Sequence, residues 1–206
     1  MPKSPTKTRP RTIAKLMDSA LELFTEKGFH ATSISDISDR AGLTRGAFYS
    51  NYRDKEELFL ALYDAQADAL IAGVDAALEA MPAGADPFAV LMEHLDARRD
   101  EERRWFLASM EFTLQAVRNE ELARDLAAHE DRVIAALTGL MERLLERSGR
   151  SPVVETADLT RLAIALHEGL TMLRLTESAR GGDSGVPDRL LPHVVRMLTE
   201  RTPPER

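Results

Sequence analysis

The side chains best suited to chemistry in this chain lie between residues 44 and 55, where a hydroxyl, a guanidinium, a phenol and an ammonium group occur close together. They belong to Thr44, Arg45, Tyr49 and Lys55. An arginine can donate two hydrogen bonds to O6 and N7 of guanine, and a lysine beside the N–H groups of a helix start can hold a phosphate. This chemistry is the non-covalent recognition of DNA, for which we expect no cofactor and no metal ion.

Two short helical segments joined by a tight turn have to position these side chains. Ser33 and Asp36 are spaced to cap the first segment, and Thr44 is suited to cap the second. Gly42 stands where the chain reverses, and glycine tolerates the positive φ that such a turn can require. The apolar residues spaced to face a core are Ile34, Ile37, Ala41 and Phe48. Arg45, Gly46, Ala47 and Tyr49 remain on or near the other face, and the pattern predicts a DNA-binding helix-turn-helix.

At these residues the sequence resembles the TetR family of bacterial transcriptional regulators, over about its first sixty residues. The order and spacing of the following segments carry the resemblance: Gly28-Phe29-His30-Ala31-Thr32, Asp36-Ile37, Ala41-Gly42-Leu43-Thr44, Gly46, Phe48-Tyr49 and Lys55-Glu56-Glu57-Leu58. Two residues depart from the family pattern, because Ser38 replaces the usual alanine and Tyr52 replaces the usual phenylalanine. The remaining two thirds of the chain match no motif that names a ligand.

The resemblance implies an all-α protein of about nine helices, with an N-terminal three-helix helix-turn-helix DNA-binding domain followed by a C-terminal helical ligand-binding and dimerisation bundle. Abundant Ala, Leu, Glu and Arg agree with this fold class. We expect a disordered arm over residues 1–10, the DNA-binding domain over 11–55 and the ligand-binding and dimerisation domain over 56–206. Outside the helix-turn-helix, helices are predicted at about 12–27, 55–81, 87–99, 101–118, 120–147, 156–179 and 188–201. Asp54 is expected to cap the helix that begins at 55, with Glu57 at its third position completing a capping box.

The DNA-binding residues follow from inserting the helix that begins at Thr44 into a major groove. Arg45 is then the best direct reader of base edges, while Gly46 and Ala47 keep the helix surface thin. By the resemblance, Tyr49 occupies a phosphate-contacting position. The full predicted set is Thr32, Ser33, Thr44, Arg45, Gly46, Ala47, Tyr49, Asn51 and Lys55. The expected partner is a near-palindromic, double-stranded DNA operator, bound by a homodimer.

Two apolar stripes near the C-terminus are candidates for the dimer interface. In the family, the last two helices form a four-helix interface with a second copy. The stripes here comprise Leu159, Leu162, Leu166, Leu170, Leu173, Leu191, Val194, Val195 and Leu198. The alternative is that both stripes only face the core of their own chain.

The middle of the chain carries large, adaptable side chains that are suited to an apolar cavity with a few polar anchors. The candidate effector-binding residues are Phe88, Met92, Trp105, Phe106, Met110, Glu111, Gln115, His129, His167 and Met172. With no basic cluster among them, they favour a small neutral or cationic lipophilic effector over a polyanion. By the resemblance, such an effector releases a repressor from its operator, and an activator is the alternative. The alternative, for each of these residues, is an ordinary position in the core.

Charge is divided unevenly along the chain. Up to Lys55 there are ten Lys and Arg against six Asp and Glu, out of 27 and 34 in the whole chain, which leaves 17 basic and 28 acidic residues after it. A mildly basic start on an acidic remainder fits phosphate binding at one end. No cysteine occurs, and neither a signal peptide nor an apolar run long enough for a bilayer is visible, so we expect a cytoplasmic protein without membrane contact.

Two other classes of function compete with a regulator. An enzyme is disfavoured, because the sequence contains no phosphate-binding glycine loop, no Gly-x-Ser-x-Gly turn and no zinc-type histidine spacing. A helical interaction module that no longer binds DNA is disfavoured by the intact Arg45, Tyr49 and Lys55. For a regulator, the resemblance implies a switch in which tilting the fourth helix changes the separation of the two DNA-reading helices of the dimer, with Gly28 and the loop 82–87 as flexible points.

Overall fold

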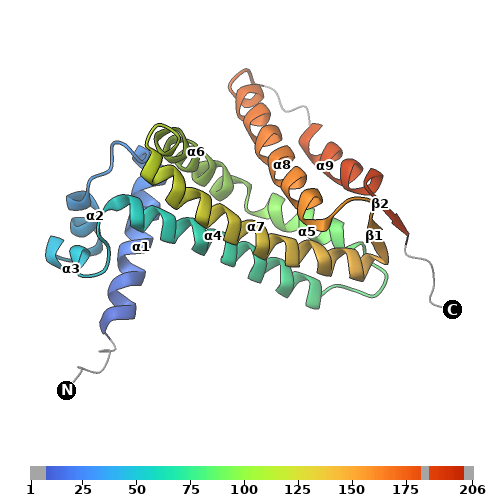
Figure 1. The fold of residues 1–206 in the computed structure, drawn as a ribbon, viewed down its shortest axis with the longest axis horizontal. Helices are drawn as coiled ribbons and strands as arrows, with labels where there is room; N and C mark the ends of the chain where they lie inside the picture. The colour runs from blue at the N-terminus through green and yellow to red at the C-terminus, as the bar shows by residue number, and fades with distance from the viewer. Residues whose placement is uncertain (1–7, 182–185, 202–206) are drawn as a thin grey trace. The chain divides into compact units, whose positions relative to one another are not determined.

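The computed structural model describes residues 8–181 and 186–201, and helices dominate them (Figure 1). The described residues form nine α-helices and two short strands: α1 (Thr8–Lys27), α2 (Ile34–Ala41), α3 (Arg45–Tyr49), α4 (Lys55–Glu79), α5 (Pro87–Ala97), α6 (Arg99–Ala116), α7 (Glu120–Ser148), β1 (Arg150–Pro152), α8 (Thr156–Ser178), α9 (Val186–Met197) and β2 (Thr199–Arg201). The predicted all-α class and the number of helices are confirmed.

The chain divides into two compact units that do not follow a single cut in the sequence. Unit 1 comprises residues 1–66 and 104–129, and unit 2 comprises residues 67–103 and 130–206. The helices α4, α6 and α7 each contribute residues to both units. The boundary predicted at residue 55, between a DNA-binding domain and a ligand-binding and dimerisation domain, remains a prediction. The contacts within the chain do not divide it at that residue.

Unit 1 is built on a cluster of aromatic rings. Phe59 is fully buried and stacks on Phe112 at 4.3 Å and on Trp105 at 5.1 Å between ring centroids. Phe29 meets Phe59 edge-on at 5.2 Å, and Phe24 lies 5.4 Å from Phe59. Such pairs add to the burial of apolar area. The core thus joins the helix-turn-helix, the start of α4 and the second half of α6 in one packed body.

Side chains define the starts of α2 and α4 in unit 1. The Ser33 hydroxyl accepts from the Asp36 N–H at 3.1 Å, and the Asp36 carboxylate accepts from the Ser33 N–H, which completes the predicted capping box of α2. The Asp54 carboxylate accepts from the Glu57 N–H at 2.8 Å, as predicted for α4. The Glu57 carboxylate, however, accepts from the N–H of Arg53 and not from that of Asp54, so the reciprocal bond closes one residue earlier than predicted.

The first helix begins earlier than the sequence pattern predicts. Helix α1 starts at Thr8, so the predicted disordered arm over residues 1–10 is too long, and its residues 1–7 lie outside the described part of the chain. Pro10 does not prevent this start, because the N–H groups of a first helical turn have no partner within the helix and proline tolerates these positions. The predicted end is confirmed, since α1 stops at Lys27 before Gly28.

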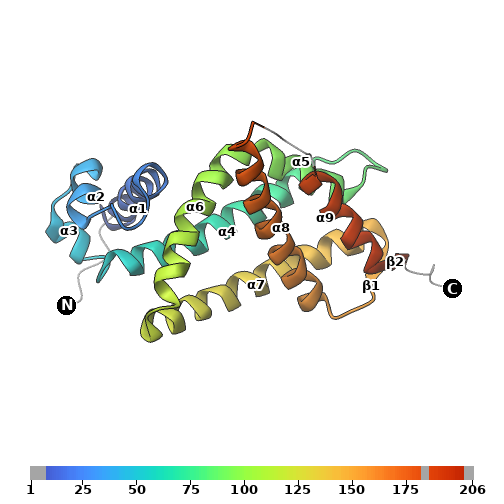
Figure 2. The same cartoon turned by 90° about the horizontal axis from the view of Figure 1, so that it is seen from above.

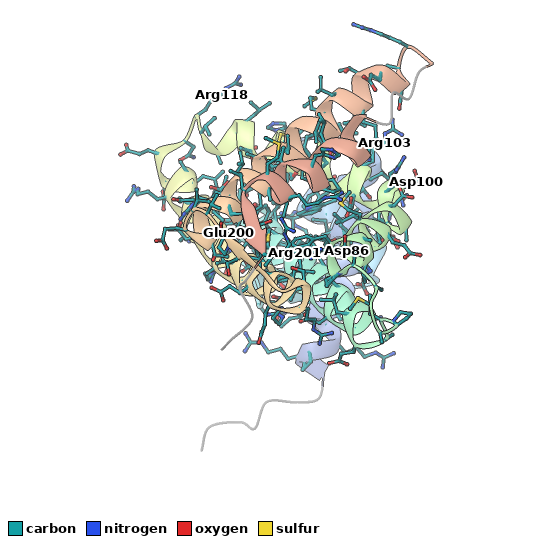
Figure 3. The ribbon with its side chains drawn as sticks, turned by 90° about the vertical axis from the view of Figure 1, so that its right-hand side faces the viewer. Asp86, Asp100, Arg103, Arg118, Glu200 and Arg201 are labelled. Carbon is teal, nitrogen blue, oxygen red and sulfur yellow. The ribbon has the colours of Figure 1, made fainter. Side chains whose placement is uncertain are left out.

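Unit 2 contains the remaining core and a small two-stranded sheet. Its buried residues include Val74, Phe88, Leu144 and Leu159, and α8 packs beside α9 (Figure 2). Strand β1 pairs with β2 in antiparallel register, with Ser151 opposite Glu200. The last predicted helix, over 188–201, is therefore wrong at its end: residues 199–201 form β2, on which Glu200 and Arg201 are labelled in Figure 3.

Candidate nucleic-acid interface

The exposed face of α3 carries the predicted reading residues. Thr44 is the N-cap of this helix, and its hydroxyl accepts from the Ala47 N–H at 3.2 Å. Phe48 is fully buried and anchors the other face, whereas Tyr49 on the next position is 50% exposed. Gly42 has a φ of 65°, as predicted for the turn before the helix. The short helix is thus held by its cap and by one inward aromatic ring, with its polar side facing solvent.

Arg45 and Tyr49 lie along this exposed side as a pair. The guanidinium of Arg45 donates to the Tyr49 hydroxyl at 3.4 Å, and its central carbon lies 5.9 Å from the centre of the tyrosine ring. Residues four positions apart on a helix are neighbours, and an arginine over an aromatic ring gains a modest cation–π attraction. The pair orders the guanidinium along the helix.

A surface hollow of about 460 Å³ lies beside the start of α3. The starts of α2 and α4 border it, and the N-terminal ends of their helix dipoles contribute a positive partial charge to this region. The residues that line it are His30, Ala31, Thr32, Ser33, Ile34, Ser35, Arg45, Asp54, Lys55 and Glu56. The hollow therefore brings Ser33, Arg45 and Lys55 together, as the DNA-binding prediction requires.

Two of the predicted phosphate-contacting residues have inward-facing partners. Thr32 is 1% exposed, and its hydroxyl donates to the carbonyl of Gly28 at 2.9 Å. The Lys55 ammonium donates to the carbonyls of Phe29 and Thr32 at 3.0 and 3.1 Å, and burial lowers the pKa of this lysine. Lys55 still borders the hollow. The side chain of Thr32, in contrast, is too buried for a phosphate contact.

Asn51 connects α3 to α1 and reveals a residue that the sequence analysis missed. Its amide nitrogen donates to the Ala47 carbonyl at 2.8 Å, and its amide oxygen accepts from Arg9 Nε at 3.3 Å. Arg9 is exposed and lies in the first turn of α1. Arg9 falls within the disordered arm predicted over residues 1–10, so it was not expected on a helix. The observed start of α1 at Thr8 places it on one.

The predicted effector-binding residues of unit 1 have partners within that unit. Trp105 stacks on Phe59 and Phe106 is buried, while Met110 is half-buried. The other three are polar and bond to residues of the same unit: Glu111 accepts from the Phe29 N–H at 2.8 Å, Gln115 donates to Glu56 at 3.3 Å, and His129 lies 2.8 Å from the Asp64 carboxylate.

In unit 2, Phe88 belongs to the core, Met92 is half-buried and Met172 is exposed. His167 Nε2 lies 3.9 Å from the Glu102 carboxylate. Burial raises the pKa of Glu102 to about 7, although Arg98 and Arg174 oppose this rise, and burial lowers the pKa of His167. Near these groups, Asp100 and Arg103 on the first turns of α6 project outward (Figure 3). Glu102 and His167 thus form a pair of titratable groups in unit 2, of which only His167 was predicted from the sequence.

The predicted dimer residues separate into buried and exposed groups. Leu159, Leu170 and Val195 are buried within unit 2. Leu166, Val194 and Leu198 are half-buried, and the side chain of Leu191 lies outside the described residues. Leu162 and Leu173 are 43% and 54% exposed, and Met197, which is not one of the predicted dimer residues, is 77% exposed. The apolar face of α8 thus supplies both core residues and a solvent-facing strip.

Comparison with protein families places both parts of the chain. Residues 16–62 match the family described as bacterial regulatory proteins, tetR family. Residues 88–199, more than half of the chain, match the C-terminal domain of BetI-type transcriptional repressors. Among the helices of the described residues, none combines the length and the apolar character that a membrane crossing requires.

Individual relatives cover most or half of the chain. An uncharacterized HTH-type transcriptional regulator, YfiR of Bacillus subtilis, is 22% identical over 82% of each chain. The HTH-type transcriptional regulator AcrR of Shigella flexneri is 34% identical over 49% of this chain and 48% of its own length. The fatty acid degradation regulator FadR of Bacillus halodurans has the same fold, with a TM-score of 0.67, 15% identity and 96% of each chain covered. Thermus thermophilus FadR, a repressor solved in complex with lauroyl-CoA, has a TM-score of 0.62 and 20% identity, with 94% of this chain and 98% of that chain covered.

Proposed function

The chain belongs to the TetR family of bacterial transcriptional regulators, and from this premise we propose that it is a repressor that binds a near-palindromic operator as a homodimer and is released by a small effector. The observation that carries the proposal is the exposed α3 face beside the hollow. There, Arg45 is ordered by Tyr49 and is bordered by the starts of α2 and α4. In this proposal α3 enters the major groove and Arg45 reads a guanine.

The phosphate contacts in this proposal come from around the hollow. Ser33 and Lys55 line it, and Tyr49 is exposed on α3. Backbone N–H groups at the starts of α2 and α4 would add to these contacts, because helix N-termini favour anions. Phosphate contacts of this kind set the orientation of the protein on the duplex and leave sequence discrimination to α3.

We propose that the exposed strip of α8 forms the dimer interface. Leu162 and Leu173 lie eleven residues apart, which returns to the same helix face after three turns. Gly169 lies between them, and a Cβ atom there would meet nothing within 4 Å apart from the backbone of its own helix. A glycine on such a strip permits a close approach of a second helix. An isologous interface of this kind presents two α3 helices to successive major grooves.

Substitution of Leu173 by glutamate should convert the dimer to a monomer. The two-fold axis places two new carboxylates in the interface, and burying an unpaired charge is costly. We expect the dissociation constant of the dimer to rise by a factor of about one hundred or more, measured by sedimentation equilibrium. Leu114→Glu is the matched control, because Leu114 is 58% exposed on α6. Dissociation by Leu114→Glu with an intact dimer in Leu173→Glu would place the interface elsewhere.

The effector is proposed to be a small lipophilic molecule. Support comes from the large apolar side chains on α5 to α8, and a repressor with the same fold has been solved in complex with lauroyl-CoA. An effector lowers the affinity for DNA only by its differential affinity for the two conformations. We also propose that the protein acts in the cytoplasm, where bacterial DNA lies, and that it has no catalytic role.

The test is binding of the purified protein to the DNA that flanks its own gene, measured by fluorescence anisotropy across a salt series. A scrambled duplex of equal length is the control. Specific binding should be about a thousandfold tighter than binding to the scrambled duplex, and it should weaken steeply as salt rises. Equal binding to all sequences would require a random-sequence selection to find the operator. Failure to bind any duplex at low salt would contradict the proposal and favour a helical interaction module.

A further inference from the structure

The turn between α1 and α2 is held by a carboxylate that comes from α6. The Phe29 N–H donates to Glu111 Oε2 at 2.8 Å, and the His30 N–H reaches the same oxygen at 3.5 Å. Successive N–H groups beside a residue of positive φ form a concavity that favours an anion, and Gly28 has a φ of 86°. A Cβ atom on Gly28 would lie 2.6 Å from both carboxylate oxygens, so the close approach of Glu111 requires a glycine.

The carbonyl groups of the same turn are held by an ammonium from α4. Lys55 Nζ donates to the carbonyls of Phe29 and Thr32 and lies 4.4 Å from the centre of the Phe29 ring. Burial lowers the pKa of Lys55, and the negative charges of Glu56 and Glu111 oppose that effect. The turn therefore binds a carboxylate through its N–H groups and an ammonium through its carbonyls. Gly28 is a packed and hydrogen-bonded position, unlike the flexible point expected from the sequence.

The neighbours of Glu111 on α6 strengthen this attachment. Phe112 is fully buried, stacks on Phe59 and lies 5.1 Å from Phe29. Gln115, one helical turn after Glu111, donates to Glu56 Oε1 at 3.3 Å. Positions separated by four residues share a helix face, so one side of α6 contacts both the turn and the start of α4.

We propose that Glu111 is a positioning residue for DNA binding. From its place on α6, it holds in position the turn that precedes α2 and α3. The turn ends at Thr32, and the next residue, Ser33, is the N-cap of α2, so the placement of the reading helix depends on the turn. Helix α6 is continuous, and its residues 99–103 belong to unit 2. An effector that shifts α6 would draw the carboxylate away from the two N–H groups, a route distinct from a tilt of α4. This inference rests on the DNA-binding role proposed above.

The experiment compares Glu111→Ala, Glu111→Gln and Leu126→Ala in the full-length protein. Leu126 is buried in the same core and its aliphatic side chain forms no hydrogen bonds, so its truncation lowers stability without removing a hydrogen bond to the turn. The measurements are operator affinity, hydrogen exchange of the Phe29 and His30 amides, and thermal unfolding. The glutamine variant keeps an oxygen that can accept both hydrogen bonds, and it serves as the conservative rescue.

We expect Glu111→Ala to weaken operator binding about tenfold or more and to speed exchange of both amides, because two N–H groups lose their acceptor. Glu111→Gln and Leu126→Ala should stay within about threefold of the wild type. The proposal is overturned if Glu111→Ala binds the operator like the wild type, or if Leu126→Ala weakens binding equally at the same loss of melting temperature. If the wild-type protein binds no DNA, the proposed function itself is overturned, and the proposed role of Glu111 in DNA binding is overturned with it.

Discussion

Replacement of Arg45 by alanine should remove most of the sequence specificity of DNA binding while leaving the fold intact. Arg45 is exposed, and its only described partner is Tyr49 on its own helix, so folding loses little. One bidentate contact with guanine contributes roughly 1–3 kcal/mol of discrimination. A two-fold dimer loses this contact in both half-sites, which amounts to about 2–6 kcal/mol, or on the order of 30-fold to 10,000-fold in operator affinity. Anisotropy titrations with operator and scrambled duplexes measure the difference.

Two further variants separate recognition of bases from loss of charge. Arg40→Ala removes the same charge from α2, where Arg40 pairs with Glu26 at 2.9 Å, and it should leave operator affinity almost unchanged. Arg45→Lys keeps the charge but loses the planar fork, so it should recover non-specific binding without recovering specificity. If Arg45→Ala instead weakened operator and scrambled duplexes equally, with a shallower dependence on salt, Arg45 would be a phosphate contact.

Local signals in the sequence predicted the parts of the fold that depend on neighbours along the chain. Ser33, Thr44 and Asp54 cap the predicted helices, because a cap needs only a side chain and an N–H two or three residues away. Gly42 adopts its positive φ for an equally local reason. The start of α1 was misplaced because Pro10 and the polar residues before it resemble an unstructured arm, although proline is compatible with a first turn.

Contacts between distant residues could not be predicted from these signals. Strands β1 and β2 have three residues each and pair across about fifty positions, too few residues for an alternating pattern to be visible. Glu111 was expected to be one of a few polar anchors in an apolar, effector-binding cavity. Its partners are N–H groups eighty-one and eighty-two positions away, which only the folded chain brings to α6. The periodicity of α8 located its apolar face but did not separate the buried Leu159 from the exposed Leu173.

Truncation of Phe59 to alanine should destabilise unit 1 more than any surface change considered above. The ring is fully buried among Phe24, Phe29, Trp105 and Phe112. Removing a buried phenylalanine costs about 3–5 kcal/mol, which includes the cavity left behind. That is a large part of the stability of an ordinary domain. Chemical denaturation should therefore show an early transition, and operator binding should be lost with it, because α3 packs on the same core through Phe48.

The matched variant Phe88→Ala makes the same truncation in the core of unit 2. Hydrogen exchange followed by mass spectrometry then tests whether the two compact units are also two cooperative units. In Phe59→Ala we expect faster exchange in residues 8–66 and 104–129 together, including the second half of α6. In Phe88→Ala the faster exchange should fall in residues 67–103 and in the described part of 130–201. If exchange in residues 104–116 is instead faster in Phe88→Ala and unchanged in Phe59→Ala, the stability of α6 depends on the core of unit 2.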